Sequence, residues 1–365
     1  MFERKDLFDL FEGASVVVTG NTGFKGAWLT AWLQSMGAKV TGISKDIPTQ
    51  PSLYNDLGVM NNVETNFIDI NETHKIAEIF RLKKPNFIFH LAAQSIVSQG
   101  FKYPYETWRT NAMGTVSILE AITVSGIKNV NVVMITSDKV YKNREWEWGY
   151  RENDELGGSD PYGNSKVAAE MAITSYSNSE PFLSRNVQIS SARAGNVIGG
   201  GDWAKGRIVP DAVRAWISQQ PLELRNPHST RPWQHVLEPI SGYLSIASAL
   251  AYSEIPTGES FNFGPIAVNP VSVATLISNI SQNLDGLPEL KWVTADQNLK
   301  EDNLLSLSSE KATQKLSWAP KLNFTEMISW IADWYTIYAS GMDVTEITLK
   351  QIEEYKSGLV VRADL

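Results

Sequence analysis

Short apolar runs alternate with amphipathic, helix-like stretches along the first half of the chain, without hairpin turn signals between them. The first run covers residues 15–19 and is followed, after a glycine-rich turn, by a predicted helix over 24–36 that ends at Gly37. The same alternation predicts further strands and helices at 39–43, 63–68, 73–84, 86–90, 106–125, 131–135, 162–178 and 186–191. Strands joined by helices pair in parallel and place helices over both faces of the sheet. The pattern therefore predicts an α/β fold with a doubly wound parallel sheet of Rossmann type.

The regular alternation ends near residue 192, and loops that contain Gly, Pro and Trp follow. A predicted helix over 237–251 and a short strand over 260–263 return to the pattern of the first half. We therefore expect one domain that carries the sheet, formed by residues 1–192 and about 236–266. Residues 193–235 and 267–365 are expected to form a smaller mixed lobe.

The composition excludes several classes of function. Hydrophobic residues make up 43% of the 365 positions and charged residues 20%, as in globular proteins rather than disordered or fibrous ones. The 32 Lys and Arg residues against 40 Asp and Glu residues give a net charge of −8 without a basic block, so nucleic acid is not an expected partner. With no cysteine and four histidines, the chain is not expected to hold a disulfide framework or a metal site.

The N-terminal residues include acids where a signal peptide needs a basic and then an apolar segment. No apolar run approaches the ~18 residues that a membrane-spanning helix needs. We therefore expect a soluble, cytoplasmic protein that has no membrane partner.

The turn after the first predicted strand holds glycines at a three-residue period, Gly20, Gly23 and Gly26. A bound diphosphate needs close backbone approach, free N–H donors and a helix N-terminus, and such a turn supplies all three. A turn that serves only tight packing is the alternative. The position after the first strand of a doubly wound sheet favours a dinucleotide site. The predicted contacts are Gly20, Thr22, Gly23, Phe24, Lys25 and Gly26.

Further residues of the predicted dinucleotide site follow the third and fourth strands, at the carboxyl edge where ligands of open α/β sheets bind. Small side chains at this edge would let a flat dinucleotide lie close to the backbone. Plain strand ends are the alternative interpretation. These candidates are Asp69, Ile70, Leu91, Ala92 and Ala93.

The end of the second predicted strand bears on the choice between NAD and NADP. Asp46 could bind the ribose diol of NAD, whereas Ser44 and Lys45 could accept the 2′-phosphate of NADP. The sequence favours NAD as the cofactor and leaves NADP open.

Tyr162 and Lys166 are four residues apart and lie on one face of a predicted helix, a spacing that an exposed helix face would also show. A neighbouring cation favours the phenolate, so we expect a lowered pKa for Tyr162 and a usable base near neutral pH. The end of the preceding strand places Ser137, Asp138 and Lys139 beside the same pocket. A hydroxyl, a phenol and an ammonium group together could deprotonate a substrate alcohol while a nicotinamide takes its hydride.

With these residues the chain resembles the extended short-chain dehydrogenase/reductases and, among them, the nucleotide-sugar 4,6-dehydratases, most of all the branch that acts on CDP-glucose. The resemblance runs from residue 15 to about 270, and the last hundred residues add little to it. Its motifs are 20–26 (GNTGFKG), 90–94 (HLAAQ), 136–139 (TSDK), 143–146, 150–154, Tyr162 with Lys166, 193–203 (RAGNVIGGGDW), 225–228 and 231–235 (RPWQH).

The resemblance implies three coupled steps on a tightly held NAD: oxidation at C4 of the sugar, loss of water across C5 and C6, and return of the hydride to C6. Tyr162 would be the base for the C4 hydroxyl, and Lys166 would be its electrostatic partner and the anchor of the nicotinamide ribose. Ser137 would donate a hydrogen bond to the C4 oxygen, and Asp138 would protonate the leaving hydroxyl. Lys139 stands where dehydratases that act on dTDP-glucose carry Glu, which leaves the identity of the C5 base open.

The resemblance also implies that the smaller lobe binds the nucleotide sugar, and that two long helices, 106–125 and 162–178, pair across a homodimer. It places the product in deoxysugar synthesis for surface polysaccharide. The predicted substrate contacts are Gln94, Asn196, Arg207, Arg231 and His235. Three alternatives stay open: a dehydratase of another nucleotide sugar, a 4-epimerase or 4-dehydrogenase of the same superfamily, and a dinucleotide sensor without catalysis.

Overall fold

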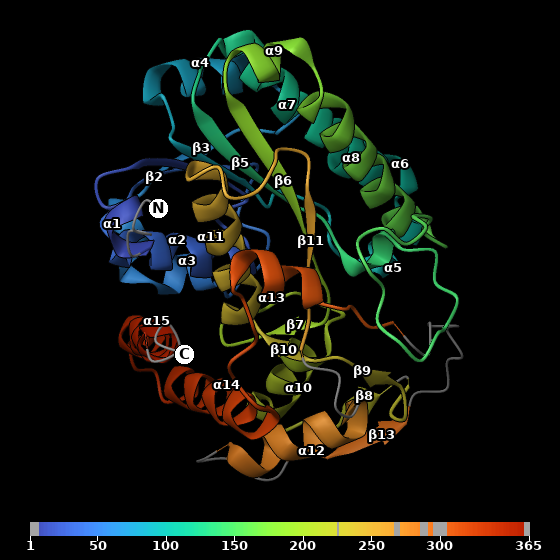
Figure 1. Cartoon of the computed structure of the whole chain (residues 1–365). Coiled ribbons are helices and arrows are strands. Elements are labelled where there is room, and N and C mark those ends of the chain that lie inside the picture. The colour runs from blue at the N-terminus through green and yellow to red at the C-terminus, as the bar shows by residue number, and fades with distance from the viewer. Residues whose placement is uncertain (1–6, 225, 266–270, 285–290, 295–304, 361–365) are drawn as a thin grey trace.

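The computed structural model describes residues 7–224, 226–265, 271–284, 291–294 and 305–360. Seven strands form one sheet in the order β11-β6-β5-β4-β1-β2-β3, and every neighbouring pair is parallel (Figure 1). These strands are β1 (Ser15–Thr19), β2 (Lys39–Ser44), β3 (Glu64–Phe67), β4 (Phe87–His90), β5 (Val130–Ile135), β6 (Val187–Ala194) and β11 (Ser260–Phe263). The strand order reverses between β1 and β4, the position where open α/β sheets bind ligands. The predicted doubly wound parallel sheet is confirmed.

Helices cover both faces of the sheet. On one face lie α2 (Phe24–Ser35) and α11 (Leu237–Ala251), and on the other lie α4 (Thr73–Lys83), α7 (Gly114–Ser125) and α8 (Pro161–Ser177) (Figure 1). Successive residues of β1 point to opposite faces, so Val16 and Val18 join the first hydrophobic cluster and Val17 joins the second. The strands are apolar on both sides because both sides are covered.

Two predicted elements differ from the structure in an informative way. The strand predicted at 186–191 continues to Ala194, because residues Ser191 to Ala194 pair with β11. The helix predicted at 106–125 is built from α6 (Pro104–Trp108), a π-helical segment η2 (Arg109–Met113) and α7. Inside the π-helical segment, the Asn111 amide bonds the backbone of Gln94 and the hydroxyl of Ser165. This local widening of the helix therefore lies beside the ligand edge of the sheet.

The remaining elements belong mostly to a second part of the molecule, which lies at the carboxyl edge of the sheet (Figure 1). Three two-stranded sheets occur here, pairing β7 with β10, β9 with β12 and β8 with β13. The bounds are α1 (Leu7–Phe11), α3 (Leu53–Asp56), η1 (Gly58–Asn62), α5 (Val97–Lys102), η3 (Asp138–Val140), α9 (Glu180–Ser184), β7 (Val197–Ile198), α10 (Ile208–Ile217), β8 (Leu222–Leu224), β9 (Thr230–Arg231), β10 (Gln234–His235), β12 (Val271–Ser272), α12 (Val273–Asn283), β13 (Trp292–Thr294), α13 (Glu310–Leu316), α14 (Phe324–Ala339) and α15 (Val344–Val360).

One hydrophobic cluster joins the two parts of the molecule. It contains Trp32 of α2 and Leu244 of α11 together with Leu276 of α12 and Trp334 of α14. The chain also returns to the sheet side at its end, where α15 packs against α2. The division into two domains with the boundaries expected above stays a prediction. Within the described part of the chain, no helix combines the length and the apolar character that crossing a membrane requires.

Candidate active site

A cavity of about 1130 Å³ opens at the carboxyl edge of the sheet, between the strand ends and the second part of the molecule. Its wall includes every predicted site residue except His235. Residues that are far apart in the chain, such as Gly20, Ser137 and Arg231, therefore meet around one space. Their individual roles stay predictions, whereas their common location is an observation.

Different physical constraints explain why glycine stands at each of the three positions of the first turn. Gly20 has a positive φ of +75°, and a Cβ on it would lie 2.7 Å from the backbone nitrogen of Ala92. A Cβ on Gly26 would overlap the carbonyl oxygen of Gly20. Gly23 meets no such obstacle, since a Cβ there would lie 3.4 Å from the nearest protein atom. Packing thus explains Gly20 and Gly26, and Gly23 leaves the cavity side open for close approach of a ligand.

The N-terminus of α2 is suited to an anion. Gly23 is its N-cap residue, and no side chain caps the helix there. The N–H groups of the first helical turn and the positive end of the helix dipole therefore lie at the part of the cavity that Gly23, Phe24 and Lys25 line. A diphosphate is the ligand that this arrangement accommodates best.

The residues at the end of β2 bear on the choice between NAD and NADP, which the sequence left open. The buried Ser44 hydroxyl donates to Oδ1 of Asn21 at 2.8 Å and accepts from the backbone N–H of Thr22 at 3.3 Å. Lys45 is exposed and forms an ion pair with Asp69 at 3.7 Å. Because both groups already have partners within the protein, this strand end favours a ribose diol over a 2′-phosphate.

The predicted catalytic groups lie together at the ends of β5 and α8. Ser137 donates from Oγ to Oδ1 of Asp138 at 3.0 Å and is also hydrogen-bonded to the Tyr162 phenol. The Asp138 carboxyl occupies the space where a Cβ on Gly195 would stand, so only glycine fits there. Lys166 donates from Nζ to the carbonyl oxygen of Ile135 at 3.3 Å. Lys139, the next residue after Asp138, lines the same cavity.

The pKa of Tyr162 differs from the sequence expectation. Burial raises the pKa of Tyr162 to about 12, although the hydrogen bond between Tyr162 and Ser137 acts in the opposite direction. Burial and the nearby Lys25 lower the pKa of Lys166 to about 7, while Glu170 raises it. The expectation that Lys166 lowers the Tyr162 pKa toward neutrality is therefore wrong for this arrangement, because desolvation of the phenolate outweighs the attraction of neighbouring cations.

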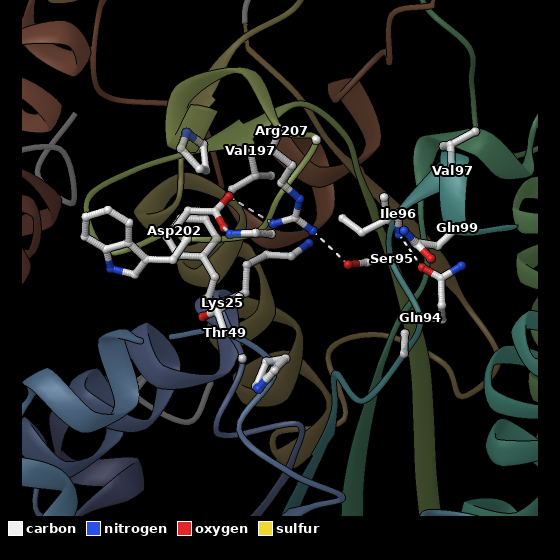
Figure 2. Close-up of a pocket in the computed structure, with 18 of the residues that line it drawn as sticks. Lys25, Thr49, Gln94, Ser95, Ile96, Val97, Gln99, Val197, Asp202 and Arg207 are labelled. Carbon is white, nitrogen blue, oxygen red and sulfur yellow. Dashed lines mark hydrogen bonds and ion pairs between the residues drawn. The ribbon is translucent and has the colours of Figure 1, made fainter. Parts of the chain in front are cut away.

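Arg207 also lines the cavity and acts electrostatically on Tyr162. It donates to the Asp202 carboxylate at 3.0 Å and to the Ser95 hydroxyl at 2.7 Å, contacts drawn as dashed lines in Figure 2. The Lys25 side chain lies beside it (Figure 2), and burial, with Arg207 second, lowers the Lys25 pKa to about 8. Lys25 and Arg207 thus face one region of the cavity together with the buried carboxylates of Asp202 and Asp138, and the two cations suit an anionic diphosphate.

The other predicted substrate contacts have different surroundings. Gln94 lines the cavity, but its side-chain amide already donates to Thr107 and accepts from the backbone of Ile96. Asn196 lines the cavity with a positive φ of 52°. Arg231 also lines it and donates to the carbonyl oxygen of Thr230 at 2.8 Å.

The structure does not support the prediction that His235 contacts the substrate. Its imidazole is buried in the core, edge-on to Trp28 at 5.9 Å and to Trp330 at 5.6 Å between ring centroids. Burial lowers the pKa of His235 to about 3, so the ring is neutral. Direct contact with a substrate does not fit this position, because the ring is buried and does not line the cavity.

Among the polar residues of the cavity that were not predicted as site residues, Asp202 and Ser95 are the ones that contact Arg207. Asp202 lies in the motif 193–203 that carried the resemblance, so a signal for it existed. Ser95 follows Gln94 in a loop, where nothing in the local pattern indicates that Arg207 reaches it from 112 residues away.

The fold and the site together define the class. A parallel sheet of this strand order, a glycine-rich turn into an uncapped helix, and a Ser, Tyr and Lys set at its carboxyl edge are those of an extended short-chain dehydrogenase/reductase. The sequence model of the family described as GDP-mannose 4,6 dehydratase matches residues 17–331. The chain belongs to this family of nucleotide-sugar dehydratases.

Individual proteins show similarity over nearly the whole chain. The CDP-glucose 4,6-dehydratase of Salmonella typhimurium is 41% identical over 355 residues, which cover 96% of this chain and 98% of that protein. The CDP-paratose 2-epimerase of Salmonella typhi is 23% identical, with 87% and 98% covered. Among solved structures, DesIV, a dTDP-glucose 4,6-dehydratase from Streptomyces venezuelae with NAD and TYD bound, superposes with a TM-score of 0.75 at 18% identity, covering 90% of this chain and 98% of that one.

Proposed function

We propose that this enzyme is a CDP-glucose 4,6-dehydratase that converts CDP-glucose to CDP-4-keto-6-deoxyglucose. The observation that carries the proposal is the 41% identity to the Salmonella CDP-glucose enzyme over 96% of the chain, against 23% for the CDP-paratose epimerase. The site supports it, because an acid, Asp138, lies next to the hydroxyl and phenol that handle the C4 oxygen.

NAD fits the cofactor half of the cavity. The glycine-rich turn with its uncapped helix would hold the diphosphate, Asp46 would meet the adenosine ribose, and Lys166 would meet the nicotinamide ribose. When bound, NAD supplies reversible hydride transfer to and from the sugar. The internal bonds of Ser44 and the Lys45–Asp69 ion pair support NAD over NADP.

The chain's own groups have distinct tasks in this reaction. Tyr162 accepts the proton of the C4 hydroxyl, and Ser137 holds the C4 oxygen by a hydrogen bond. Burial raises the pKa of Tyr162 to about 12, so Tyr162 takes up this proton only in its phenolate form, after it has lost its own proton. A neighbouring cation such as Lys166 favours that form. Asp138 protonates the leaving C6 hydroxyl, and Lys139 is the proposed base for C5.

Asp138 also separates the proposal from its alternatives. A 4-epimerase or 4-dehydrogenase eliminates no water and has no use for an acid held between Ser137 and Gly195. A dinucleotide sensor has no use for a reactive hydroxyl, phenol and ammonium in one cavity.

The activity is tested by incubation of the purified protein with CDP-glucose and, in parallel, with dTDP-, UDP- and GDP-sugars. The expected result is a 4-keto-6-deoxy product from CDP-glucose, seen by mass spectrometry and by its alkaline ultraviolet band, with the highest kcat/KM in the series. A product that retains the 6-hydroxyl, or a preference for another nucleotide, would contradict the proposal.

The enzyme is proposed to act as a homodimer. Exposed apolar side chains gather on α5, α6, η2 and α8, which is unusual for a free surface. They are Phe101 (64% exposed), Tyr105 (75%), Trp108 (42%), Met113 (57%) and Met171 (64%). Light scattering at micromolar concentration is expected to give twice the chain mass, and a stable monomer would remove this claim. The cytoplasmic location and the role in surface polysaccharide synthesis stay predictions.

A further inference from the structure

Three side chains of α8, each one helical turn apart, hold the end of β5. Tyr162 is hydrogen-bonded to Ser137, and Lys166 donates to the carbonyl oxygen of the last residue of β5 at 3.3 Å. Glu170 accepts at Oε1 from the hydroxyl of Thr136 at 2.5 Å. Three turns of the helix therefore contact residues 135–137, the segment that carries the catalytic serine. The proposed function uses the first two contacts but not the third.

The Glu170 carboxylate is held on its other side by β6. Arg193 donates from Nε to Oε1 and from Nη2 to Oε2, both at 2.9 Å, and the Ser191 hydroxyl donates to Oε2 at 2.8 Å. The exposed fractions of the Arg193 and Glu170 side chains are only 4% and 2%. Burial of two charges in this way is costly, and a pair of apolar residues would often stabilise a fold as well. Stability alone is therefore a weak reason for this ion pair.

Arg193 extends the same network to the far edge of the sheet. Its Nη1 donates to the Tyr141 hydroxyl at 2.8 Å, and Tyr141 in turn donates to Oδ1 of Asn262 on β11 at 2.7 Å. The carbonyl oxygen of Glu152 accepts from Nη1 of Arg193 at 3.2 Å. Polar groups of β5, β6, β11 and the 141–152 segment are thus connected behind the catalytic residues, and Glu170 is the member that reaches both Thr136 and Arg193.

The charge of Glu170 also acts on Lys166. The titratable groups that act on Lys166 or lie one helical turn from it are Lys25 on α2, His90 on β4, and Tyr162 and Glu170 on α8, and Asp138 in η3 acts on Lys25. Burial lowers the pKa of His90 to about 3, so His90 is neutral at physiological pH, and Lys25 disfavours a second cation. Glu170 is the carboxylate that favours the charged form of Lys166.

We propose that Glu170 is a positioning residue for the dehydratase: held by Arg193, it fixes Thr136, which directly follows β5, beside the catalytic Ser137, and its negative charge, one helical turn from Lys166, favours the Lys166 ammonium while the reaction runs. The inference rests on the proposed function, because it concerns the same Ser137, Tyr162 and Lys166. It assigns a task to a buried ion pair that otherwise has only a structural explanation.

The role of the Glu170 charge is tested with Glu170→Gln. This variant keeps the size of the side chain and the acceptor for the Thr136 hydroxyl but removes the negative charge. Because the pKa of Lys166 is lowered to about 7, activity that needs the ammonium declines above that pH. Loss of the Glu170 charge lowers the pKa of Lys166 further. The alkaline limb of the kcat/KM profile is therefore expected to shift to lower pH by about one pH unit. Glu170→Asp, which retains the charge, is expected to keep the limb in place. An unmoved limb in Glu170→Gln would overturn the charge role.

The link to β5 is tested with Thr136→Val, which removes one hydroxyl and alters no charge. The expected result is a kcat about tenfold lower, with KM for CDP-glucose within twofold, an unmoved alkaline limb and a thermal midpoint within a few degrees of wild type. This variant also covers the case in which Glu170→Gln does not fold, since it leaves the ion pair intact. Wild-type kcat in Thr136→Val would overturn the positioning role.

Different results would contradict the proposed function and the positioning role of Glu170. Absence of wild-type turnover with CDP-glucose contradicts the proposed function. In that case the pH profiles are measured with the nucleotide sugar that wild type does convert, and the Glu170 comparison still decides the positioning role.

Discussion

Replacement of Gly195 by alanine is expected to separate water elimination from oxidation in this enzyme. A Cβ on Gly195 would overlap the carboxyl group of Asp138, which bonds Ser137 at 3.0 Å. The φ of Gly195 is not in the left-handed region, so alanine is compatible with the backbone, and the three atoms nearest to its Cβ all belong to the Asp138 carboxyl group. Asp138 must therefore turn away from Ser137 and from the C6 hydroxyl that it is proposed to protonate.

The magnitude follows from the loss of a general acid. Such a loss costs ~10²–10⁴-fold in rate, or about 3–5 kcal/mol in the barrier at 1.36 kcal/mol per tenfold. Formation of the 4-keto-6-deoxy product is expected to fall by this factor, as in Asp138→Asn. Oxidation at C4 depends on Tyr162 and Ser137 and is expected to persist, so acid-quenched mixtures should contain an oxidised sugar that keeps its 6-hydroxyl.

Mass spectrometry of the quenched sugar nucleotide measures both steps in one sample. Gly157→Ala is a matched control, because the nearest atom to its added Cβ is a Lys142 side-chain carbon at 3.5 Å, an ordinary contact. If Gly195→Ala forms the deoxy product within twofold of the wild-type rate, the tight fit of Asp138 over Gly195 does not serve the elimination, and the reasoning is refuted.

Three further predictions concern the same cavity. Tyr162→Phe is expected to block oxidation altogether and return unchanged CDP-glucose, whereas detectable oxidised sugar would exclude Tyr162 as the proton acceptor. If Lys139 is the C5 base, Lys139→Met is expected to abolish solvent deuterium incorporation at C5, and persistent incorporation measured by NMR would assign that step to another group. Denaturation of the purified protein is expected to release a nicotinamide dinucleotide without a 2′-phosphate, because the Ser44 hydroxyl is bonded to Asn21; recovery of mostly NADP would contradict this.

The parts of this molecule that sequence determines are those set by local patterns. A period of two or 3.6 residues is a property of a short segment, so the seven strands of the main sheet and the helices α2, α4, α8 and α11 could be predicted to within a few residues. The same holds for Tyr162 and Lys166, whose spacing puts them on one helix face wherever that helix lies. The glycine-rich turn is local as well, since its position between a strand and a helix is written in the sequence.

Tertiary structure decided the features that depend on distant residues. His235 stands in a polar motif, and only the packing of Trp28 and Trp330 around it shows that it lies in the core. The pKa of Tyr162 depends on how much water the whole fold removes from the phenol, and spacing along a helix carries no information about that.

The fit of Asp138 over Gly195, the Arg207–Ser95 contact and the Glu170–Arg193 pair join segments 23 to 112 residues apart. No local preference encodes such contacts, because each depends on side-chain directions at two separate strand or loop ends. The sequence thus determined the glycine-rich turn and the Ser137, Tyr162 and Lys166 set at the carboxyl edge of the sheet. The fold decided their distances, their hydration and their charge states, which are the quantities on which catalysis depends.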